Sequence, residues 1–301
     1  MAYQLTNGIL TVDIAEPGED YRETRFEWNG LITGITLLDG GHSFCTSENL
    51  TEGQGGGMGL CHEFGIKEAI GYQDTKPGEQ FPKLGVGLLT RTDEGPYFFY
   101  KDYPVQPFKV EIEQGSPEEI TFTTLPEECG GYAALLEKRI SIDGQSLSIA
   151  YSLHNTGQKK LSTEEYCHNF LNINGCSIGP DYKLDFPVIL QPESDDDKTL
   201  QELMFDAGRV IWGKVPEHEF YFRTGGYDGT RKPYLWELSH LPSGAGVREV
   251  SRLEVSYAAV WGRSYVVSPE IFYRIEAEPG QCIKWTRTYE FFPKIQNSRS
   301  L

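Results

Sequence analysis

A histidine lies among acidic and aromatic residues in the segment 163–175. If this segment is a strand, every second side chain points to the same face of the sheet, and one face then carries Glu164, Tyr166, His168 and Phe170. Such a mixture suits a sugar, because its C–H patches stack on aromatic rings while its hydroxyl groups hydrogen-bond to charged partners. The alternative is a core histidine that is hydrogen-bonded to a backbone carbonyl.

A carboxylate follows a proline late in the chain, at Pro269-Glu270. Proline lacks the N–H that a central ladder needs, so we expect Glu270 at a strand edge or bulge, near Trp261 and Arg263. A carboxylate in such a place is suited to act as a general base. A surface ion pair with Arg274 is an equally weighted alternative.

Cysteine precedes histidine twice, at Cys61-His62 and at Cys167-His168. Neighbouring side chains on a strand point to opposite faces, so neither pair forms a thiol–imidazole dyad by itself. The spacing of zinc ligands is also absent. His62 and Glu63 follow the glycine-rich stretch 52–59, which lacks the ending of a phosphate-binding loop. We interpret this titratable pair either as the wall of a site or as a core feature.

The elements that must position these groups are almost all strands. Residues 147–153 alternate between apolar and polar side chains, and an Asp143-Gly144 turn joins them to 140–142 in a predicted hairpin. Further strands, including a second hairpin around Asn29-Gly30, are predicted at 26–28, 31–35, 109–113, 119–124, 183–190, 234–238, 266–275 and 282–291.

Helical periodicity is confined to one short segment, about 198–205, which the carboxylates of Asp195, Asp196 and Asp197 are placed to cap. Because strands and helices do not alternate, a doubly wound sheet is excluded. Strands recur from end to end without a polar or proline-rich linker. The sequence therefore predicts an all-β fold, a large antiparallel β-sandwich that forms a single domain over residues 1–301.

The composition limits the classes of partner. The 301 residues include 27 Lys and Arg and 44 Asp and Glu, which gives a net charge of −17 and argues against a nucleic-acid binder. No apolar run approaches the roughly 20 residues of a membrane span. The first residues do not form a signal peptide, and six scattered cysteines are typical of free thiols in a reducing compartment. We therefore predict a cytoplasmic protein with no membrane partner.

Two of these segments carry a resemblance to a known family. His168-Asn169-Phe170-Leu171-Asn172 resembles the strand of the aldose 1-epimerase (galactose mutarotase-like) superfamily in which a histidine precedes an aromatic residue and an asparagine. Glu270, followed by Glu278-Pro279-Gly280 and a last strand at 285–291, resembles the late glutamate of that family. The Asn-Arg pair and the second histidine of the family have no clean match, so the chain looks like a divergent branch.

The resemblance implies a single large antiparallel β-sandwich that interconverts the α and β anomers of a free sugar without a cofactor. It implies that Glu270 accepts the proton of the anomeric hydroxyl, while a protonated His168 donates one to the ring oxygen. The expected substrate-binding residues are His62, Lys83, Arg25, Asp228, Arg263 and Trp261, with Arg25 and Arg263 suited to an acidic or phosphorylated sugar.

Two other functions are compatible with the same candidate residues, which we expect to line a cleft. One is a carbohydrate-binding or lyase-like relative that uses the cleft on an oligosaccharide or a uronic acid. Another is a non-catalytic sensor that binds a sugar without turnover. In each case the expected partner is a small-molecule sugar, and the sequence leaves open whether the chain forms a homodimer.

Overall fold

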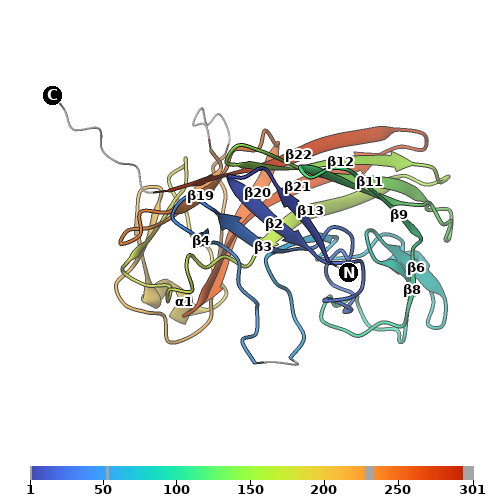
Figure 1. Cartoon of the computed structure of the whole chain (residues 1–301). Helices are drawn as coiled ribbons and strands as arrows, with labels where there is room; N and C mark the ends of the chain where they lie inside the picture. Colours follow the sequence, from blue (N-terminus) through green and yellow to red (C-terminus); the bar gives the residue numbers. More distant parts are fainter. Residues whose placement is uncertain (1, 52–53, 228–233, 294–301) are drawn as a thin grey trace.

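The computed structural model describes residues 2–51, 54–227 and 234–293. Within these ranges almost all regular structure is antiparallel β, arranged in two large sheets and one small sheet (Figure 1). The predicted all-β class and the large antiparallel sandwich are therefore confirmed.

The first sheet carries the residues of interest. Its strands lie in the order β1 (Tyr3–Thr6), β2 (Leu10–Ile14), β3 (Ile32–Leu37), β5 (Leu60–Phe64), β13 (Leu161–Asn169), β21 (Val266–Ala277), β20 (Val255–Arg263) and β17 (Phe220–Thr224), with β4 (His42–Ser43) paired to β3 outside this order.

The second sheet covers one face of the first. Its strands lie in the order β15 (Leu203–Asp206), β16 (Arg209–Trp212), β14 (Tyr182–Asp185), β18 (Trp236–His240), β19 (Gly246–Glu249), β22 (Cys282–Phe292), β12 (Ser146–Asn155), β11 (Ala134–Asp143), β10 (Glu119–Thr124) and β9 (Val110–Ser116). The small sheet consists of β6 (Gln80–Lys83), β7 (Gly87–Thr90) and β8 (Val105–Pro107).

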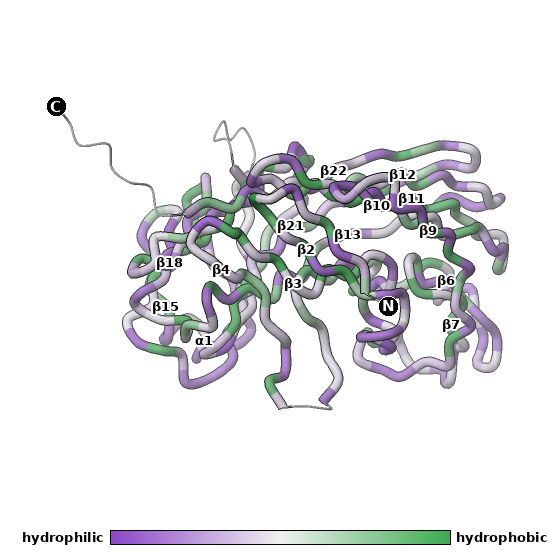
Figure 2. Tube along the Cα trace, in the orientation of Figure 1, coloured by the Kyte–Doolittle hydropathy of each residue, from purple (hydrophilic) through white to green (hydrophobic). Residues whose placement is uncertain are grey.

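The space between the two large sheets is filled mainly by apolar side chains. Leu147, Ile149 and Leu153 of β12 are fully buried, as the predicted alternation requires. Phe44, next to β4 of the first sheet, packs against Phe291 of the second with 4.9 Å between the ring centroids. Hydrophobic segments accordingly run through the strands in Figure 2, whereas many peripheral loops are hydrophilic. Burial of these apolar faces holds the sheets together.

Several local predictions are confirmed. β11 and β12 form the predicted hairpin, with Asp143 paired to Ser146 and Gly144 at a φ of 55° in the turn. The last predicted strand is β22. The helix α1 (Asp197–Glu202) begins where expected, and the Asp196 carboxylate accepts a hydrogen bond from the Lys198 N–H at 3.0 Å. It ends earlier than predicted, because the chain turns into β15 at Leu203.

Two local predictions are wrong. Residues 26–28 form no hairpin with 31–35, because the Trp28 N–H donates to the Gly85 carbonyl instead of to a neighbouring strand. The strand predicted at 183–190 ends at Asp185 as β14, and Pro187, which has no N–H to donate, follows shortly after. A single turn of 3₁₀ helix, η1 (Tyr72–Asp74), precedes the small sheet.

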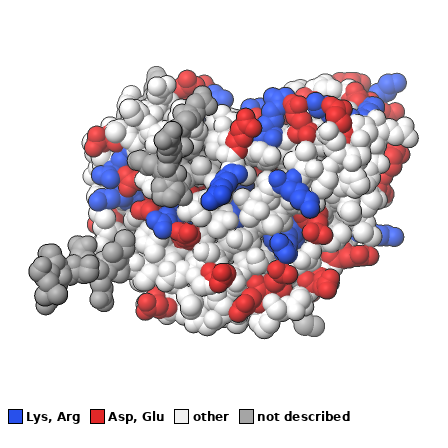
Figure 3. All heavy atoms as spheres, turned by 90° about the horizontal axis from the view of Figure 1, so that it is seen from above, with Lys and Arg blue, Asp and Glu red and all other residues white. Residues whose placement is uncertain are grey.

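Charged side chains of both signs are interspersed on the face seen in Figure 3. Among the exposed ion pairs of the described residues, Arg248 lies 2.7 Å from the Glu290 carboxylate of the neighbouring strand. No helix within residues 2–51, 54–227 and 234–293 has the length and apolar character needed to cross a bilayer. All six cysteines are free thiols.

Candidate functional site

Four adjacent strands of the first sheet position the candidate residues. In antiparallel pairs, directly opposed residues point to the same face. Glu63 of β5 is opposite Tyr166 of β13, so both lie on the face that carries His168 two residues further along β13. On β20 and β21, Trp261 and Glu270 contribute to the same face, since both approach the His168 ring.

His168 and Glu270 form a close pair. The imidazole Nε2 lies 3.3 Å from Glu270 Oε1, and each residue is only 3% exposed. Ser268 Oγ donates a hydrogen bond to the same carboxyl oxygen at 3.0 Å. The other imidazole nitrogen, Nδ1, is buried and has no hydrogen-bond partner among the described residues. An orphaned buried nitrogen is costly in free energy, and His62 Nε2 is orphaned in the same way.

Burial controls the charge of this pair. It raises the pKa of Glu270 to about 8, against the opposing effects of Arg25 and of the hydrogen bond from Ser268. Burial, reinforced by the positive charge of Arg25, holds the pKa of His168 well below its ordinary value. Near pH 7 the pair therefore holds one proton, on the glutamic acid, and the imidazole is neutral. This is the reverse of the predicted charges, because desolvation disfavours both ions.

Aromatic rings enclose the histidine. The Phe170 ring stacks on the imidazole with 4.1 Å between centroids, and the Trp261 and Phe26 rings lie at 5.1 and 5.8 Å in edge-on arrangements. These rings fix the orientation of His168 and provide the apolar surroundings that desolvate it. The predicted placement of an imidazole between aromatic rings is present in the structure.

A buried ionic group lies beside the pair. Glu63 accepts hydrogen bonds from Arg25 Nε at 3.0 Å and from Lys83 Nζ at 3.3 Å. Tyr166 Oη donates to the same carboxylate at 2.6 Å and accepts from Arg25 Nη2 at 2.9 Å. Lys83 also donates to Tyr97 Oη at 2.9 Å. Arg25 and Lys83 thus lie near the pair, as predicted, but a carboxylate already neutralises part of their charge.

Glu270 is predicted at a strand edge or bulge; it does not lie at a sheet edge, but at an interruption of the ladder. β21 is hydrogen-bonded on both sides, to β20 and to β13, but the ladder to β13 ends at Glu165 opposite Tyr273. Beyond that point Asn169 bridges the two strands, with its backbone N–H donating to Ser268 Oγ and its side chain donating to the Pro269 carbonyl. Proline is tolerated in a central strand here because the ladder is interrupted at that position.

His62 lies on the opposite face of the first sheet from His168. Its Nδ1 is 2.8 Å from Glu165 Oε1, and its ring packs edge-on against Tyr151 of the second sheet, 5.3 Å between centroids. Burial, followed by the positive charge of Lys138, lowers the pKa of His62 to about 3. The prediction that His62 contacts the sugar is therefore wrong, because the alternation along β5 directs Glu63 to that face instead.

Of the two remaining predicted residues, Arg263 lies further out. Arg263 stands over the Trp261 ring at 5.1 Å, and its Nη2 donates to Glu219 at 2.7 Å, so its charge is paired at the edge of the cluster. Asp228 lies outside the described residues. Glu63, Tyr166 and Ser268 belong to the cluster but were not among the predicted site residues. For Tyr166 the signal was available, since it shares the predicted face of β13 with His168.

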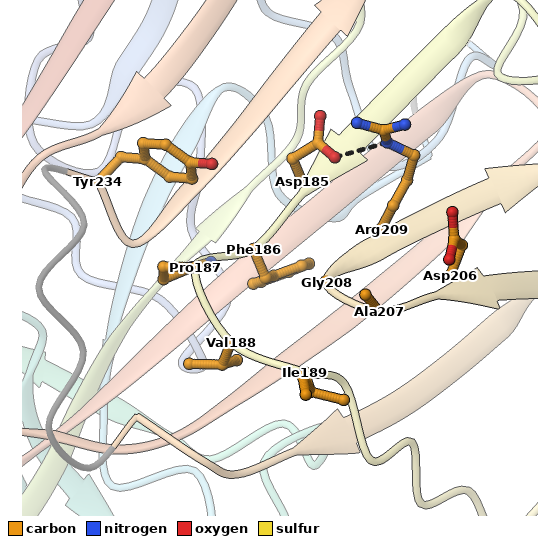
Figure 4. Close-up of a pocket in the computed structure, with 10 residues that line it drawn as sticks. All are labelled: Asp185, Phe186, Pro187, Val188, Ile189, Asp206, Ala207, Gly208, Arg209 and Tyr234. Atoms are coloured by element: carbon orange, nitrogen blue, oxygen red, sulfur yellow. Dashed lines mark hydrogen bonds and ion pairs between the residues drawn. The ribbon is translucent and has the colours of Figure 1, made fainter.

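A surface pocket elsewhere offers a contrast. It has a volume of about 400 Å³ and lies at the end of β14 and the turn between β15 and β16 (Figure 4). Two of its charged groups pair with each other, because Arg209 Nε donates to Asp185 Oδ1 at 2.6 Å. None of the predicted site residues that the structure describes lines it. Among the described residues, no cluster of three or more His, Cys, Asp or Glu side chains is arranged to hold a metal ion.

The comparisons with known proteins bear on the fold. No family model and no curated protein matches the chain. Among solved structures, a galactose mutarotase-related enzyme from Lactobacillus acidophilus covers 98% of this chain and 99% of its own length, with a TM-score of 0.61 at 12% identity. A GalM/aldose epimerase homologue from C. elegans covers 97% and 99%, with a TM-score of 0.62 at 12% identity.

A galactose mutarotase-like protein from Lactobacillus casei is similar over 97% of this chain and 100% of its own, with a TM-score of 0.59 at 12% identity. Identities this low say nothing about which sugar is bound or which reaction is catalysed, since one fold hosts many functions. The low identities agree with the divergence seen in the sequence. The chain thus has the galactose mutarotase-like fold.

Proposed function

We propose that the protein is an aldose 1-epimerase-type isomerase that interconverts the anomers of a neutral sugar. The observation that supports this is the His168–Glu270 pair, in which an acid and a base 3.3 Å apart hold one proton in nearly dry surroundings. Anomer exchange requires one proton to leave the anomeric hydroxyl and one to reach the ring oxygen. Both oxygens are bonded to the same carbon, so donor and acceptor must lie close together.

Ring opening uses both members of the pair. Glu270 donates its proton to the ring oxygen as the bond from that oxygen to the anomeric carbon breaks. His168 Nε2 accepts the proton of the anomeric hydroxyl, and the electrons of that O–H bond form the carbonyl double bond. The products are an open-chain aldehyde, a Glu270 carboxylate and a His168 imidazolium. Their opposite charges stabilise each other at a separation of a few ångströms, with little water to screen them.

Ring closure reverses these transfers. Rotation about the bond between the first two carbons presents the other face of the carbonyl. The hydroxyl that was the ring oxygen attacks it and returns its proton to Glu270, while His168 protonates the carbonyl oxygen. The pair ends with its proton where it began. Both histidine and glutamate therefore act as acid and as base in one cycle, starting from the neutral pair that burial favours.

The surrounding charges favour a neutral sugar over an anionic one. The three nitrogens of Arg25 donate to Glu63, Tyr100 and Tyr166. Lys83 donates to Glu63 and Tyr97. An acidic or phosphorylated sugar would have to compete with the Glu63 carboxylate for these cations. This argues against the alternative in which the cleft acts on a uronic acid.

Anomer exchange measured by saturation-transfer NMR tests the proposal directly. The panel comprises neutral hexoses and pentoses, a uronic acid and a sugar phosphate, each with wild type, Glu270→Gln and His168→Leu. We expect acceleration with at least one neutral aldose and a loss of about 100-fold or more in both variants. Arg248→Met, which changes an exposed ion pair, is the control.

Two outcomes would contradict the proposal: no acceleration with any sugar, or full activity in both variants. A lyase would instead release an unsaturated product that absorbs in the ultraviolet. A sensor would bind a sugar without accelerating its anomer exchange.

A further inference from the structure

Arg25, Lys83 and Glu63 form the ionic part of the buried group beside the His168–Glu270 pair, and all three are buried. The Glu63 carboxylate lies 3.0 Å from Arg25 Nε and 3.3 Å from Lys83 Nζ. Two positive charges therefore share one negative charge. The protein interior screens a charge less than water does, so a buried charge that is only partly balanced acts on groups that it does not touch.

Arg25 is the cation that approaches the pair. Its Nη2 donates to Tyr166 Oη at 2.9 Å, and its guanidinium carbon lies 4.5 Å from the centre of the Phe26 ring. The rings of Tyr166 and Phe26 lie 6.3 and 5.8 Å from the His168 ring. Arg25 thus contacts two residues whose rings in turn lie beside the imidazole, which places its positive charge one residue away from the proton-transfer groups.

Lys83 faces a different part of the molecule. Its Nζ donates to Tyr97 Oη at 2.9 Å and lies 5.4 Å from the centre of the Tyr97 ring. Tyr97 packs in turn against Phe81 of the small sheet, with 6.3 Å between the ring centroids. The two cations share a carboxylate but have different neighbours, so Lys83 is a matched control for Arg25.

The charge of Arg25 opposes protonation of both members of the pair. Burial lowers the pKa of His168 well below its ordinary value, and Arg25 adds to this effect. Burial raises the pKa of Glu270 to about 8, and Arg25 limits the rise, whereas the Glu63 carboxylate adds to it. The exchange proposed above starts from a neutral imidazole and from a glutamic acid that can release its proton. Arg25 favours both conditions.

Other titratable groups from four strands of the first sheet face the pair, and they are neutral near pH 7. Burial raises the pKa of each of them: Cys61 of β5, Tyr166 of β13, Tyr257 of β20 and Tyr221 of β17. Arg223, which is exposed on β17, acts on the two last-named tyrosines rather than on the pair. Among the described residues, the charges that act on Glu270 are therefore those of Arg25 and Glu63, and they have opposite signs.

We propose that Arg25 is a positioning residue that sets the pH range of the His168–Glu270 pair: its buried charge keeps the imidazole neutral and makes the Glu270 proton available, without contact between Arg25 and the sugar. This proposal rests on the function proposed above and adds the regulation of the same site. Each of the three nitrogens of Arg25 already donates a hydrogen bond within the protein, so the guanidinium acts through its charge.

The pH profile of kcat/KM for anomer exchange of a neutral aldose tests the proposal. In wild type the rate should fall above the pKa of Glu270, about 8, because the ionised group has no proton to donate. We expect this alkaline midpoint to rise by about one pH unit in Arg25→Gln and to fall by about one unit in Glu63→Gln. It should stay within about 0.3 units of wild type in Arg25→Lys, which keeps the charge, and in Lys83→Gln, which removes the other cation from the same carboxylate.

Infrared titration of the protonated Glu270 carboxyl group, whose C=O band is assigned by its loss in Glu270→Gln, gives the same midpoint without turnover. Opposite shifts in Arg25→Gln and Glu63→Gln support the proposal even if no sugar is turned over, in which case only the proposed reaction fails. If Arg25→Gln does not fold, the downward shift in Glu63→Gln decides.

An unmoved midpoint in Glu63→Gln and in folded Arg25→Gln overturns the proposal. An equal rise in Arg25→Gln and Lys83→Gln also overturns it, because the effect would then belong to Glu63 and not to Arg25. A higher KM in Arg25→Gln with an unmoved midpoint would show that Arg25 binds the sugar instead, and would leave the proposed reaction intact.

Discussion

The first sheet carries a buried ionisable cluster on each of its faces, and the two clusters differ in whether an arginine contacts their carboxyl groups directly. On one face lies the site pair, His168 and Glu270. On the face toward the second sheet lies the core cluster, formed by His62, Glu165, Arg287 and Glu249. Both clusters contain one histidine and at least one carboxylate, and both are buried.

In the core cluster the ions are matched. Arg287 Nη2 donates to Glu165 Oε2 and Nη1 to Glu249 Oε1, each at 2.8 Å. Burial alone would raise the pKa of Glu165, but the charge of Arg287 and the hydrogen bond from His62 outweigh it and lower the pKa to about 2. Glu249 also accepts from the Trp236 indole N–H at 2.8 Å. The Glu165 carboxylate is therefore held charged and does not exchange protons near neutral pH.

In the site pair, by contrast, no arginine of the described residues contacts the carboxyl group directly. Glu270 accepts one hydrogen bond, from Ser268, and its pKa is raised to about 8. Burial by itself therefore does not make a carboxylate reactive. A direct cationic partner determines whether the buried group stays ionised as part of the scaffold or holds a proton that it can transfer.

Removing the cation from the core cluster should have the largest effect on stability. Arg287→Met leaves Glu165 and Glu249 buried without their counter-ion, so we expect it to lower the free energy of unfolding by about 3–5 kcal/mol. Urea denaturation followed by tryptophan fluorescence measures this. In the exposed control Arg248→Met the loss should stay below about 1 kcal/mol. Equal losses in the two variants would show that the core cluster is not what holds these strands.

The second largest effect should be on the pH dependence of stability, which has opposite signs for the carboxyl groups of the two clusters. The folded-state pKa of Glu270 is about 8 and its ordinary value is 4.5, so the folded protein binds more protons than the unfolded chain between these values. Stability contributed by this group is present below pH 4.5 and is lost as the pH rises to 8, by about 3 kcal/mol or more. Glu270→Gln should remove this loss.

Urea denaturation at pH 5, 6.5 and 8 compares wild type with Glu270→Gln. For Glu165 the sign is opposite, since its pKa is lowered from 4.5 to about 2, and its contribution is lost on the acid side. If wild type and Glu270→Gln lost the same stability between pH 5 and 8, the raised pKa of Glu270 would be refuted.

Substitutions of the two histidines should differ by a smaller amount in the free energy of unfolding. His62→Leu removes a partner from the Glu165 carboxylate and should cost about 2 kcal/mol at pH 7. His168→Leu removes a partner from Glu270, but that carboxyl group is held neutral by burial and keeps the hydrogen bond from Ser268, so the cost should stay within about 1 kcal/mol. Thermal or urea unfolding of the two variants side by side gives the comparison. A larger loss for His168→Leu would contradict this division between scaffold and site.

Much of the fold could be predicted from the sequence, because alternation and turn chemistry are local. Residues 140–153 encode their hairpin through a period of two and an Asp143-Gly144 turn, and β12 accordingly pairs in the expected register. The hairpin expected around Asn29-Gly30 fails for a non-local reason. The backbone N–H of Trp28 donates to the carbonyl of Gly85, more than fifty residues away. No local sequence pattern predicts that contact.

The site could be predicted in part. His168 shares a predicted strand face with Tyr166 and Phe170, and Glu270 follows a proline in an apolar run, so local patterns single out both residues. On β5, all five residues are buried, so burial gives no period that distinguishes His62 from Glu63. The partner strand decides between them, through the register that places Glu63 opposite Tyr166. Arg287 points to the same face of β22 as the apolar residues Trp285 and Tyr289. This position in the alternation is a sequence signal of a buried cation.

The central claim is that the histidine of the site pair transfers protons and the histidine of the core cluster does not. The rate of anomer exchange of a neutral aldose, measured at pH 7 for His168→Leu and His62→Leu with both proteins verified as folded, tests it most directly. The account predicts a loss of at least about 100-fold in kcat/KM for His168→Leu and a change within about threefold for His62→Leu. Equal losses in both variants, or full activity in His168→Leu, would contradict it.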